Sequence, residues 1–146
     1  MSQTPLHTPR LTLRIGQPSD AASLVEALGD REVSGQLSRV PWPYTLADAD
    51  RFIVGMAGGT NEGLPRFLIF QRVGAGETLV GGIGVTRGGG DAIKIGYWVA
   101  RRAWGQGIAS EALAVFFDVL RDQGWKWVFA EHKPDNAASA RVLEKC

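Results

Sequence analysis

The sequence predicts an α+β (mixed α/β) fold, in which an antiparallel meander of strands is followed by one βαβ crossover. Three short apolar runs separated by glycine-rich turns are typical of antiparallel strands. These runs are 67–70, 79–85 and 92–99. The crossover is indicated by a helical pattern at 108–123, whose apolar stripe is broad enough for burial against a sheet, and by an alternating run at 125–130.

The first half of the chain predicts one strand and several helices. Residues 10–15 alternate apolar and polar side chains, which is typical of a half-buried strand. Helical spacing and helix-start residues indicate three helices. They are expected at 21–28, 31–38 and 46–56. Ser19 or Asp20 can cap the first of these helices, and Thr45 can cap the third.

The bulk composition suits a single globular domain. The 146 residues are enough for one core, and we expect one domain over 1–146. A formal net charge of +1 gives no polyanion-binding signature, so no nucleic-acid or membrane partner is expected. The single cysteine, Cys146, cannot form an intrachain disulfide, and no apolar run is long enough to span a bilayer. The expected location is the cytoplasm.

A glycine loop lies between the third strand of the meander and the helix that begins near Ile108. The first N–H groups of a helix lack partners within it and lie at the positive end of the helix dipole. Gly105 and Gly107 allow positive φ and a close approach of phosphate to the backbone. Arg101 and Arg102 precede them and can add charge-assisted bonds. The loop is therefore interpreted as a pyrophosphate site, although a plain strand-to-helix turn would explain one of its glycines.

The loop also carries a family signature. Arg102-x-x-Gly105-x-Gly107 resembles the Arg/Gln-x-x-Gly-x-Gly/Ala sequence of the GCN5-related N-acetyltransferases (GNAT), in which this loop holds the pyrophosphate of acetyl-CoA. The resemblance covers nearly the whole chain in order. It implies a GNAT-like central mixed sheet with helices on both faces, and an N-acetyltransferase that uses acetyl-CoA as acetyl donor. Three further runs resemble the ribosomal-protein-alanine acetyltransferase (RimJ/RimL-like) branch: 95–98, 108–113 and 136–145.

The resemblance assigns the cofactor to one strand, one loop and one helix start. Backbone groups of the strand would pair with the pantetheine arm, which requires this strand to splay away from the strand at 125–130. The N–H groups of the loop would hold the pyrophosphate, with Arg102 beside it. Asn136 would contact the pantetheine side, which is compatible with a plain role as N-cap of the last helix. The cofactor-binding residues expected in this way are Tyr97, Trp98, Val99, Arg102, Gly105, Gln106, Gly107, Ile108, Ala109 and Asn136.

Catalysis would be direct attack of a substrate amine on the acetyl thioester in a ternary complex. The resemblance places Ser139 near the thioester sulfur, where it could protonate the leaving thiolate or simply be a small packing residue. Relatives often carry an acid where this chain has Lys94, so Glu131 and His132 are the remaining candidates for the base, and each could instead be a solvated surface group. The expected catalytic residues are Ser139 and Glu131, and the expected acceptor is a protein N-terminus or a small-molecule amine.

Two other functions stay open at the level of the sequence. Two more strands usually follow the last helix in the resembled family, and we expect them to be missing because the sequence ends at Cys146. The missing strands and the presence of Lys94 would be compatible with a non-catalytic CoA-binding or protein-interaction module with this fold. The sheet edge that the missing strands would leave exposed predicts a homodimer. The other alternative is a dinucleotide site, because 105–110 is close to Gly-x-Gly-x-x-Gly/Ala and Glu131 could bind a ribose. No zinc, nucleophile-elbow or P-loop motif occurs, so no metal is expected.

Overall fold

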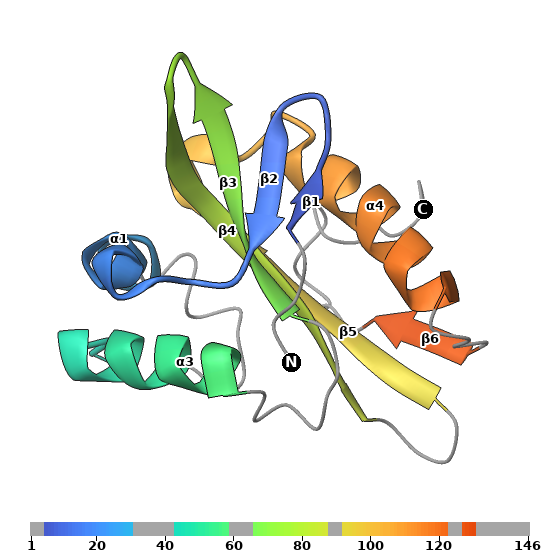
Figure 1. Ribbon diagram of the computed structural model, residues 1–146, viewed down its shortest axis with the longest axis horizontal. Coiled ribbons are helices and arrows are strands. Elements are labelled where there is room, and N and C mark those ends of the chain that lie inside the picture. The colour runs from blue at the N-terminus through green and yellow to red at the C-terminus, as the bar shows by residue number, and fades with distance from the viewer. Residues whose placement is uncertain (1–4, 31–42, 59–65, 88–91, 123–126, 131–146) are drawn as a thin grey trace.

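The computed structural model describes five stretches of the chain: 5–30, 43–58, 66–87, 92–122 and 127–130. Their elements (Figure 1) are β1 (Leu6–His7), β2 (Leu11–Arg14), a 3-10 helix (Pro18–Asp20), α1 (Ala21–Leu28), α3 (Leu46–Gly58), β3 (Arg66–Val73), β4 (Gly76–Arg87), β5 (Ala92–Val99), a second 3-10 helix (Arg101–Ala103), α4 (Ile108–Asp122) and β6 (Trp127–Ala130). The helices expected at 31–38 and after Asn136 lie outside the described residues.

The strands form one six-stranded sheet in the order β1-β2-β3-β4-β5-β6. Every neighbouring pair is antiparallel except β5 and β6, which are parallel. Because α4 connects β5 to β6 (Figure 1), the expected meander followed by one βαβ crossover is confirmed. The tight turn between β3 and β4 holds Gly74 at φ 59°, a left-handed conformation that glycine adopts without strain.

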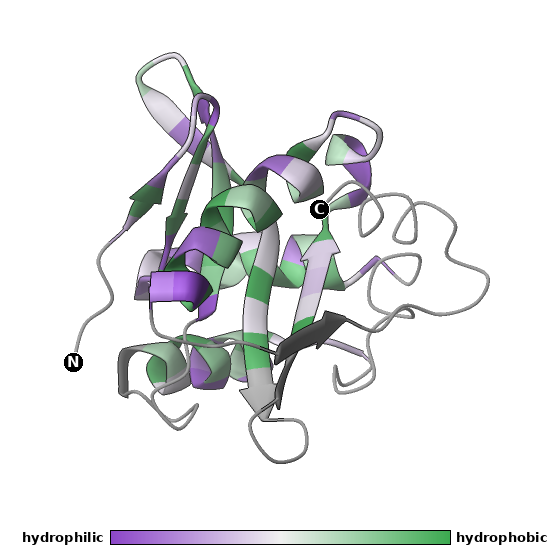
Figure 2. Cartoon of the chain, turned by 90° about the vertical axis from the view of Figure 1, so that its right-hand side faces the viewer, coloured by the Kyte–Doolittle hydropathy of each residue, from purple (hydrophilic) through white to green (hydrophobic). Residues whose placement is uncertain are grey.

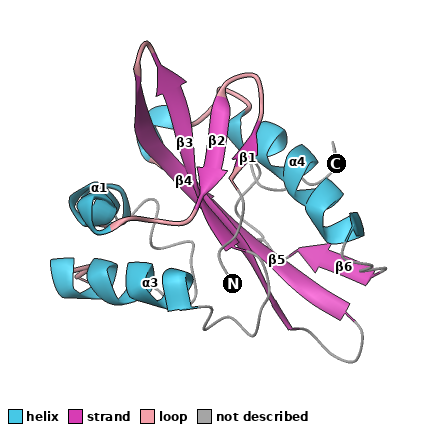
Figure 3. Ribbon diagram, in the orientation of Figure 1, coloured by secondary structure: helices cyan, strands magenta, loops and turns pink. Residues whose placement is uncertain are grey.

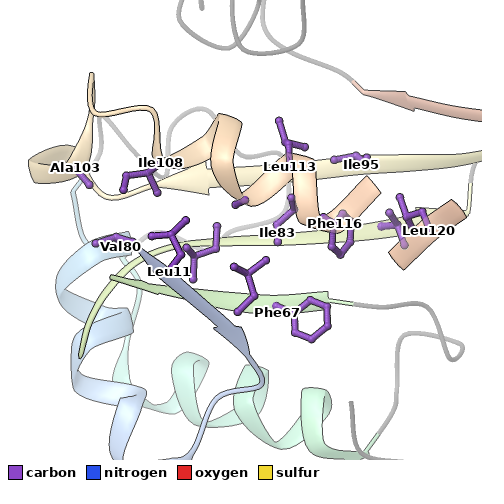
Figure 4. Packing of buried hydrophobic residues seen from close by; sticks show 14 residues of the cluster. Leu11, Phe67, Val80, Ile83, Ile95, Ala103, Ile108, Leu113, Phe116 and Leu120 are labelled. Atoms are coloured by element: carbon purple, nitrogen blue, oxygen red, sulfur yellow. The ribbon is translucent and has the colours of Figure 1, made fainter. Parts of the chain in front are cut away.

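Helices cover both faces of the sheet, as expected, and the core is divided accordingly (Figure 3). On one face α4 packs against the strands through Phe116 and Leu113 (Figure 4). On the other face α1 and α3 pack against β3 and β4 through Leu24 and Ile53. The helices in Figure 2 carry both hydrophobic and hydrophilic residues, as burial of one helix face requires. Ile108 belongs to the α4 cluster, so the core itself holds the start of α4 in place.

The two helix starts that the sequence indicates differ in outcome. Thr45 caps α3 as expected: its Oγ1 accepts the Asp48 N–H at 3.2 Å, and its own N–H donates to the Asp48 carboxylate at 2.9 Å. Asp20 precedes α1 but makes no side-chain cap bond to it. Its carboxylate accepts the Gln17 N–H at 2.7 Å and pairs with Arg14 at 3.0 Å. The expected cap on α1 is therefore wrong for Asp20, whose carboxylate binds Gln17 and Arg14 instead of the first amides of α1.

β4 and β5 approach closely beside two glycines of β4. A Cβ on Gly81 would lie 2.4 Å from the main-chain oxygen of Trp98, and a Cβ on Gly82 would lie 2.4 Å from the indole nitrogen of the same residue. We expect Gly81→Ala to lower the free energy of unfolding by about 1–3 kcal/mol, because a clash with main chain is relieved only by moving the strands apart. Urea unfolding measures the change.

The matched control for this substitution lies in the same strand. Among the described residues, a Cβ on Gly76 would meet nothing closer than the Val73 oxygen at 3.9 Å, so Gly76→Ala should leave the unfolding midpoint nearly unchanged. If Gly81→Ala were as stable as Gly76→Ala, the close approach of β4 and β5 would be contradicted.

Candidate cofactor site

The loop before α4 has the backbone conformation that its two glycines predict. Gly105 and Gly107 adopt φ 76° and φ 75°, values at which a residue with a Cβ is strained. A Cβ on Gly105 would meet no heavy atom of the described residues within 4 Å, so these residues leave the space beside it open. Both glycines are therefore needed for the path of the chain, and a plain turn with one glycine does not account for them.

The first amides of α4 are the candidate anion-binding groups. The Glu111 N–H donates to the Gly107 oxygen at 3.1 Å, so the N–H groups that precede it lie at the open end of the helix. Within the described part of the chain, the N–H groups of Gly107, Ile108 and Ala109 donate to no other protein group. These amides lie at the positive end of the helix dipole, where a phosphate can bind.

Arg101 and Arg102 are both engaged by groups on the α1 side of the loop. The Nη2 of Arg102 donates to the Leu79 oxygen at 2.6 Å, and its Nη1 lies 3.7 Å from the Glu26 carboxylate. The Nε of Arg101 lies 3.2 Å from the Asp30 carboxylate. The two arginines thus attach the loop to β4 and to the end of α1, a structural role that the sequence pattern does not reveal.

A different arginine lies beside the glycine loop. The Nη2 of Arg10 is 3.6 Å from the position that a Cβ on Gly107 would occupy. Arg10 immediately precedes β2, and its Nε donates to the Glu111 carboxylate at 2.8 Å. The same carboxylate accepts the Arg10 N–H at 3.0 Å and the Thr8 hydroxyl. Sequence reasoning missed Arg10, because 101 positions separate it from Glu111 and no local pattern marks the contact.

Glu111 is a carboxylate in the first turn of α4 whose charge is compensated by these donors. Burial raises the pKa of the Glu111 carboxyl, but the hydrogen bonds from Thr8 and Arg10 and the charge of Arg10 outweigh burial, so the pKa is lower than usual. Because the pKa of Glu111 is lower in the folded chain than in the unfolded chain, its carboxylate stabilises the fold at pH values above the unfolded-state pKa. That contribution is lost as the pH falls through the folded-state pKa.

We therefore expect Glu111→Gln to be less stable than the wild-type chain at neutral pH, with a difference that shrinks as the pH falls below about 4. Urea unfolding of both chains over a pH series measures the difference. A difference that stayed constant into the acid range would show that the charge of Glu111 does not contribute to stability.

Within the described residues, the far end of β5 extends beyond its pairing with β6. The β5–β6 register runs from Ala92 opposite Trp127 to Ile95 opposite Ala130, and β5 continues past the tip of β6 in Figure 1. The segment 96–99 remains paired with β4 on its other side. This segment contains Tyr97, Trp98 and Val99, whose backbone groups the family resemblance assigns to the pantetheine arm, and it leads into the glycine loop.

The side chains of this β5 segment divide between the two faces of the sheet. Tyr97 and Val99 pack against the α4 cluster, whereas Trp98 packs against the cluster of α1 and α3. The indole N–H of Trp104 donates to the Val99 oxygen at 2.7 Å, which connects the end of β5 to the glycine loop. Gln106 makes a similar contact within the loop, donating to the Arg102 oxygen at 3.1 Å. The loop is thus attached at both ends to elements with buried cores.

Several predicted residues lie outside the described residues, namely Glu131, His132, Asn136 and Ser139, and of Lys94 only the backbone is described. In the described stretches, no group of three or more His, Cys, Asp or Glu side chains could hold a metal ion. None of the helices in those stretches is long and apolar enough to cross a membrane.

Comparison with protein families decides how this geometry is to be interpreted. The model of the acetyltransferase (GNAT) domain family matches residues 10–146. The chain belongs to the GNAT acetyltransferase family. A search of curated proteins found no match to this sequence.

Solved GNAT structures share the fold of this chain. RimJ of Mycobacterium smegmatis in complex with CoA-disulfide is 25% identical, with 97% of this chain and 72% of that chain covered and a TM-score of 0.73. RimL, a ribosomal L7/L12 α-N-protein acetyltransferase in complex with coenzyme A, is 22% identical, with coverages of 97% and 82% and a TM-score of 0.77. A ribosomal-protein-S5-alanine acetyltransferase from Vibrio fischeri is 16% identical, with coverages of 98% and 81% and a TM-score of 0.78. The predicted similarity to the RimJ/RimL-like branch is confirmed.

Membership in the GNAT family defines the reaction class. The chain is an N-acetyltransferase that transfers an acetyl group from acetyl-CoA to an amine. Acetyl-CoA is therefore the donor substrate, and the acceptor contains an amine.

Proposed function

We propose that this GNAT domain, extending over 1–146, acetylates the N-terminal α-amine of a protein by direct attack on acetyl-CoA in a ternary complex. Binding of acetyl-CoA is supported by the loop before α4, in which Gly105 and Gly107 have positive φ. In the described residues, the first amides of α4 after this loop have no protein acceptors. Those amides would bind the diphosphate. The pantetheine arm would lie along Tyr97, Trp98 and Val99, which extend past the described part of the β6 ladder.

The proposed reaction needs no covalent intermediate on the protein. The amine nitrogen attacks the acetyl carbonyl carbon, the carbon–sulfur bond breaks, and CoA leaves as a thiolate that takes up a proton. The amine loses one proton. The chain contributes mainly by positioning, because binding of both substrates in one complex replaces a bimolecular encounter. Ser139 is our candidate for protonating the thiolate and Glu131 for accepting the amine proton.

Protonation favours an α-amine as the acceptor over a lysine side chain. An α-amino group has an ordinary pKa of about 7.7–8.0, whereas that of a lysine is about 10.4. A substantial fraction of an α-amine is therefore neutral and nucleophilic near pH 7 even before a base acts. The structural neighbours include an α-N-protein acetyltransferase, which supports the same class of acceptor.

The test is release of free CoA thiol from acetyl-CoA with matched acceptors. One peptide has a free N-terminus and one internal lysine, its partner has the same sequence with a blocked N-terminus, and a set of small amines completes the panel. Sustained release with the first peptide alone supports the proposal. Release only with small amines would overturn the proposed acceptor.

The same samples separate the two alternative functions. Thermal stabilisation by acetyl-CoA without thiol release from any amine would identify a non-catalytic CoA-binding module. Stabilisation by NADH and none by acetyl-CoA would identify a dinucleotide site instead.

A further inference from the structure

Arg10 has N–H groups that the described structure leaves available beside the glycine loop. Its guanidinium has five N–H donors, of which the one on Nε binds Glu111 at 2.8 Å. The Nη groups donate to no protein group in the described stretches. Because Nη2 lies 3.6 Å from the Cβ position of Gly107, these donors are at the mouth of the loop that precedes α4.

Glu111 and Thr8 hold this arginine in one orientation. The Glu111 carboxylate accepts both the Nε–H and the main-chain N–H of Arg10, so it binds the residue at two points. The Thr8 hydroxyl also donates to this carboxylate and accepts the Leu11 N–H at 2.9 Å, which connects the cluster to the start of β2. A guanidinium held through Nε presents its Nη groups as a preorganised pair of donors.

Arg102, the arginine of the family signature, is engaged elsewhere. One of its Nη groups donates to the Leu79 oxygen at 2.6 Å and the other lies 3.7 Å from Glu26. The side chain of Arg10 is 41% exposed, and its Nη groups have no such protein acceptors in the described part of the chain. Arg10 therefore offers N–H donors that a phosphate oxygen could use without breaking any contact within the described residues.

We infer that Arg10 binds a phosphate group of acetyl-CoA through its Nη groups, and that Glu111 and Thr8 position it for this contact. The inference rests on the proposed function, because it places the cofactor phosphates at the start of α4. It also explains how a carboxylate in the first helical turn coexists with a bound anion: Glu111 is paired with the cation that contacts that anion, so its repulsion of the phosphates is compensated.

The decisive experiment compares donors with and without phosphates. Steady-state kinetics of the wild-type chain and Arg10→Met are measured with acetyl-CoA and with S-acetylpantetheine, which lacks every phosphate. We expect kcat/KM for acetyl-CoA to fall by about 10- to 100-fold, as for loss of a charge-assisted hydrogen bond. The value for S-acetylpantetheine should change by less than about twofold. Acetyl-dephospho-CoA then identifies the phosphate: a persisting defect assigns the diphosphate, and a defect that disappears assigns the 3′-phosphate.

Three further variants separate phosphate binding from structure. Arg10→Lys keeps the charge and should recover part of the loss. Glu111→Gln keeps the Arg10 guanidinium but weakens the contact that orients it. The fall in kcat/KM for acetyl-CoA should therefore be smaller than that of Arg10→Met. Arg121→Met removes an exposed arginine from the other end of α4 and should match the wild-type chain.

The inference is overturned if kcat/KM of Arg10→Met for acetyl-CoA equals that of the wild-type chain. It is also overturned if kcat/KM of this variant falls by the same factor for acetyl-CoA and for S-acetylpantetheine. If no donor is turned over by the wild-type chain, calorimetry with CoA and pantetheine replaces kinetics. Arg10→Met should then weaken binding of CoA and not that of pantetheine. A wild-type chain that binds neither would refute the proposed function together with this inference, whereas unchanged CoA binding in Arg10→Met refutes the inference alone.

Discussion

Gly107→Glu is expected to abolish binding of acetyl-CoA while leaving the fold intact. The new carboxylate would lie at the positive end of α4 and within reach of Arg10, whose Nη2 is 3.6 Å from the Cβ position. It would occupy the position that we assign to the diphosphate and repel that group. Because the diphosphate would lose more than one hydrogen bond, each contributing about 1.5–3 kcal/mol when one partner is charged, we expect the Kd for acetyl-CoA to rise by at least about 100-fold. Isothermal titration calorimetry measures it.

Two control variants separate charge from backbone strain. Gly107→Ala adds only a Cβ at φ 75° and should cost about 1 kcal/mol, mostly in stability. Gly74→Glu places the same carboxylate on a left-handed glycine in the β3–β4 turn, outside the glycine loop, and should bind acetyl-CoA normally. Normal binding by Gly107→Glu would remove the α4 amides from the cofactor site.

Phe116→Ala is expected to cause the largest loss of stability among the substitutions considered. Phe116 is fully buried in the α4 cluster and packs edge-to-face on Phe67, with ring centroids 6.1 Å apart. Removal of a buried phenyl ring leaves a cavity as well as lost apolar contacts, so we expect the free energy of unfolding to fall by about 3–5 kcal/mol. Urea unfolding, or the change in Tm, measures this loss.

Phe117→Ala is the matched control, because this neighbouring phenylalanine of α4 is only partly buried. It should cost clearly less than Phe116→Ala. Equal losses for the two variants would contradict the orientation of α4 on the sheet. Since the cofactor site contains no Phe116 atom, the folded fraction of Phe116→Ala should retain its affinity for acetyl-CoA.

The sequence predicts those features of the fold that local chemistry determines. The broad apolar stripe of 108–123 corresponds to α4 (Ile108–Asp122), and the turn chemistry of Thr45 corresponds to the start of α3. β1 was not predicted, because Leu6–His7 lies in a polar, proline-containing stretch and becomes a strand only by pairing with β2. The sequence predicts that this strand starts at 79, but β4 begins at Gly76. Its backbone pairing with β3 continues to the turn and does not depend on the polarity of the side chains.

The same distinction between local and long-range interactions applies to the candidate cofactor site. The positive φ of Gly105 and Gly107 follows from residue type and local spacing, so the loop could be identified from the sequence. The role of Arg10 could not, because its contact with Glu111 depends on how β2 packs beside α4. For the same reason, no local pattern indicates that Leu79 and Glu26 engage the arginine of the family signature.

The most direct test of the account is an NMR titration of the isotopically labelled chain with CoA and with pantetheine. If the start of α4 binds the diphosphate, the amide resonances of Gly107, Ile108 and Ala109 will shift in a saturable way with CoA and much less with pantetheine. If CoA binds and shifts resonances elsewhere while these three amides stay unchanged, the α4 start is not the phosphate site and the central claim is wrong.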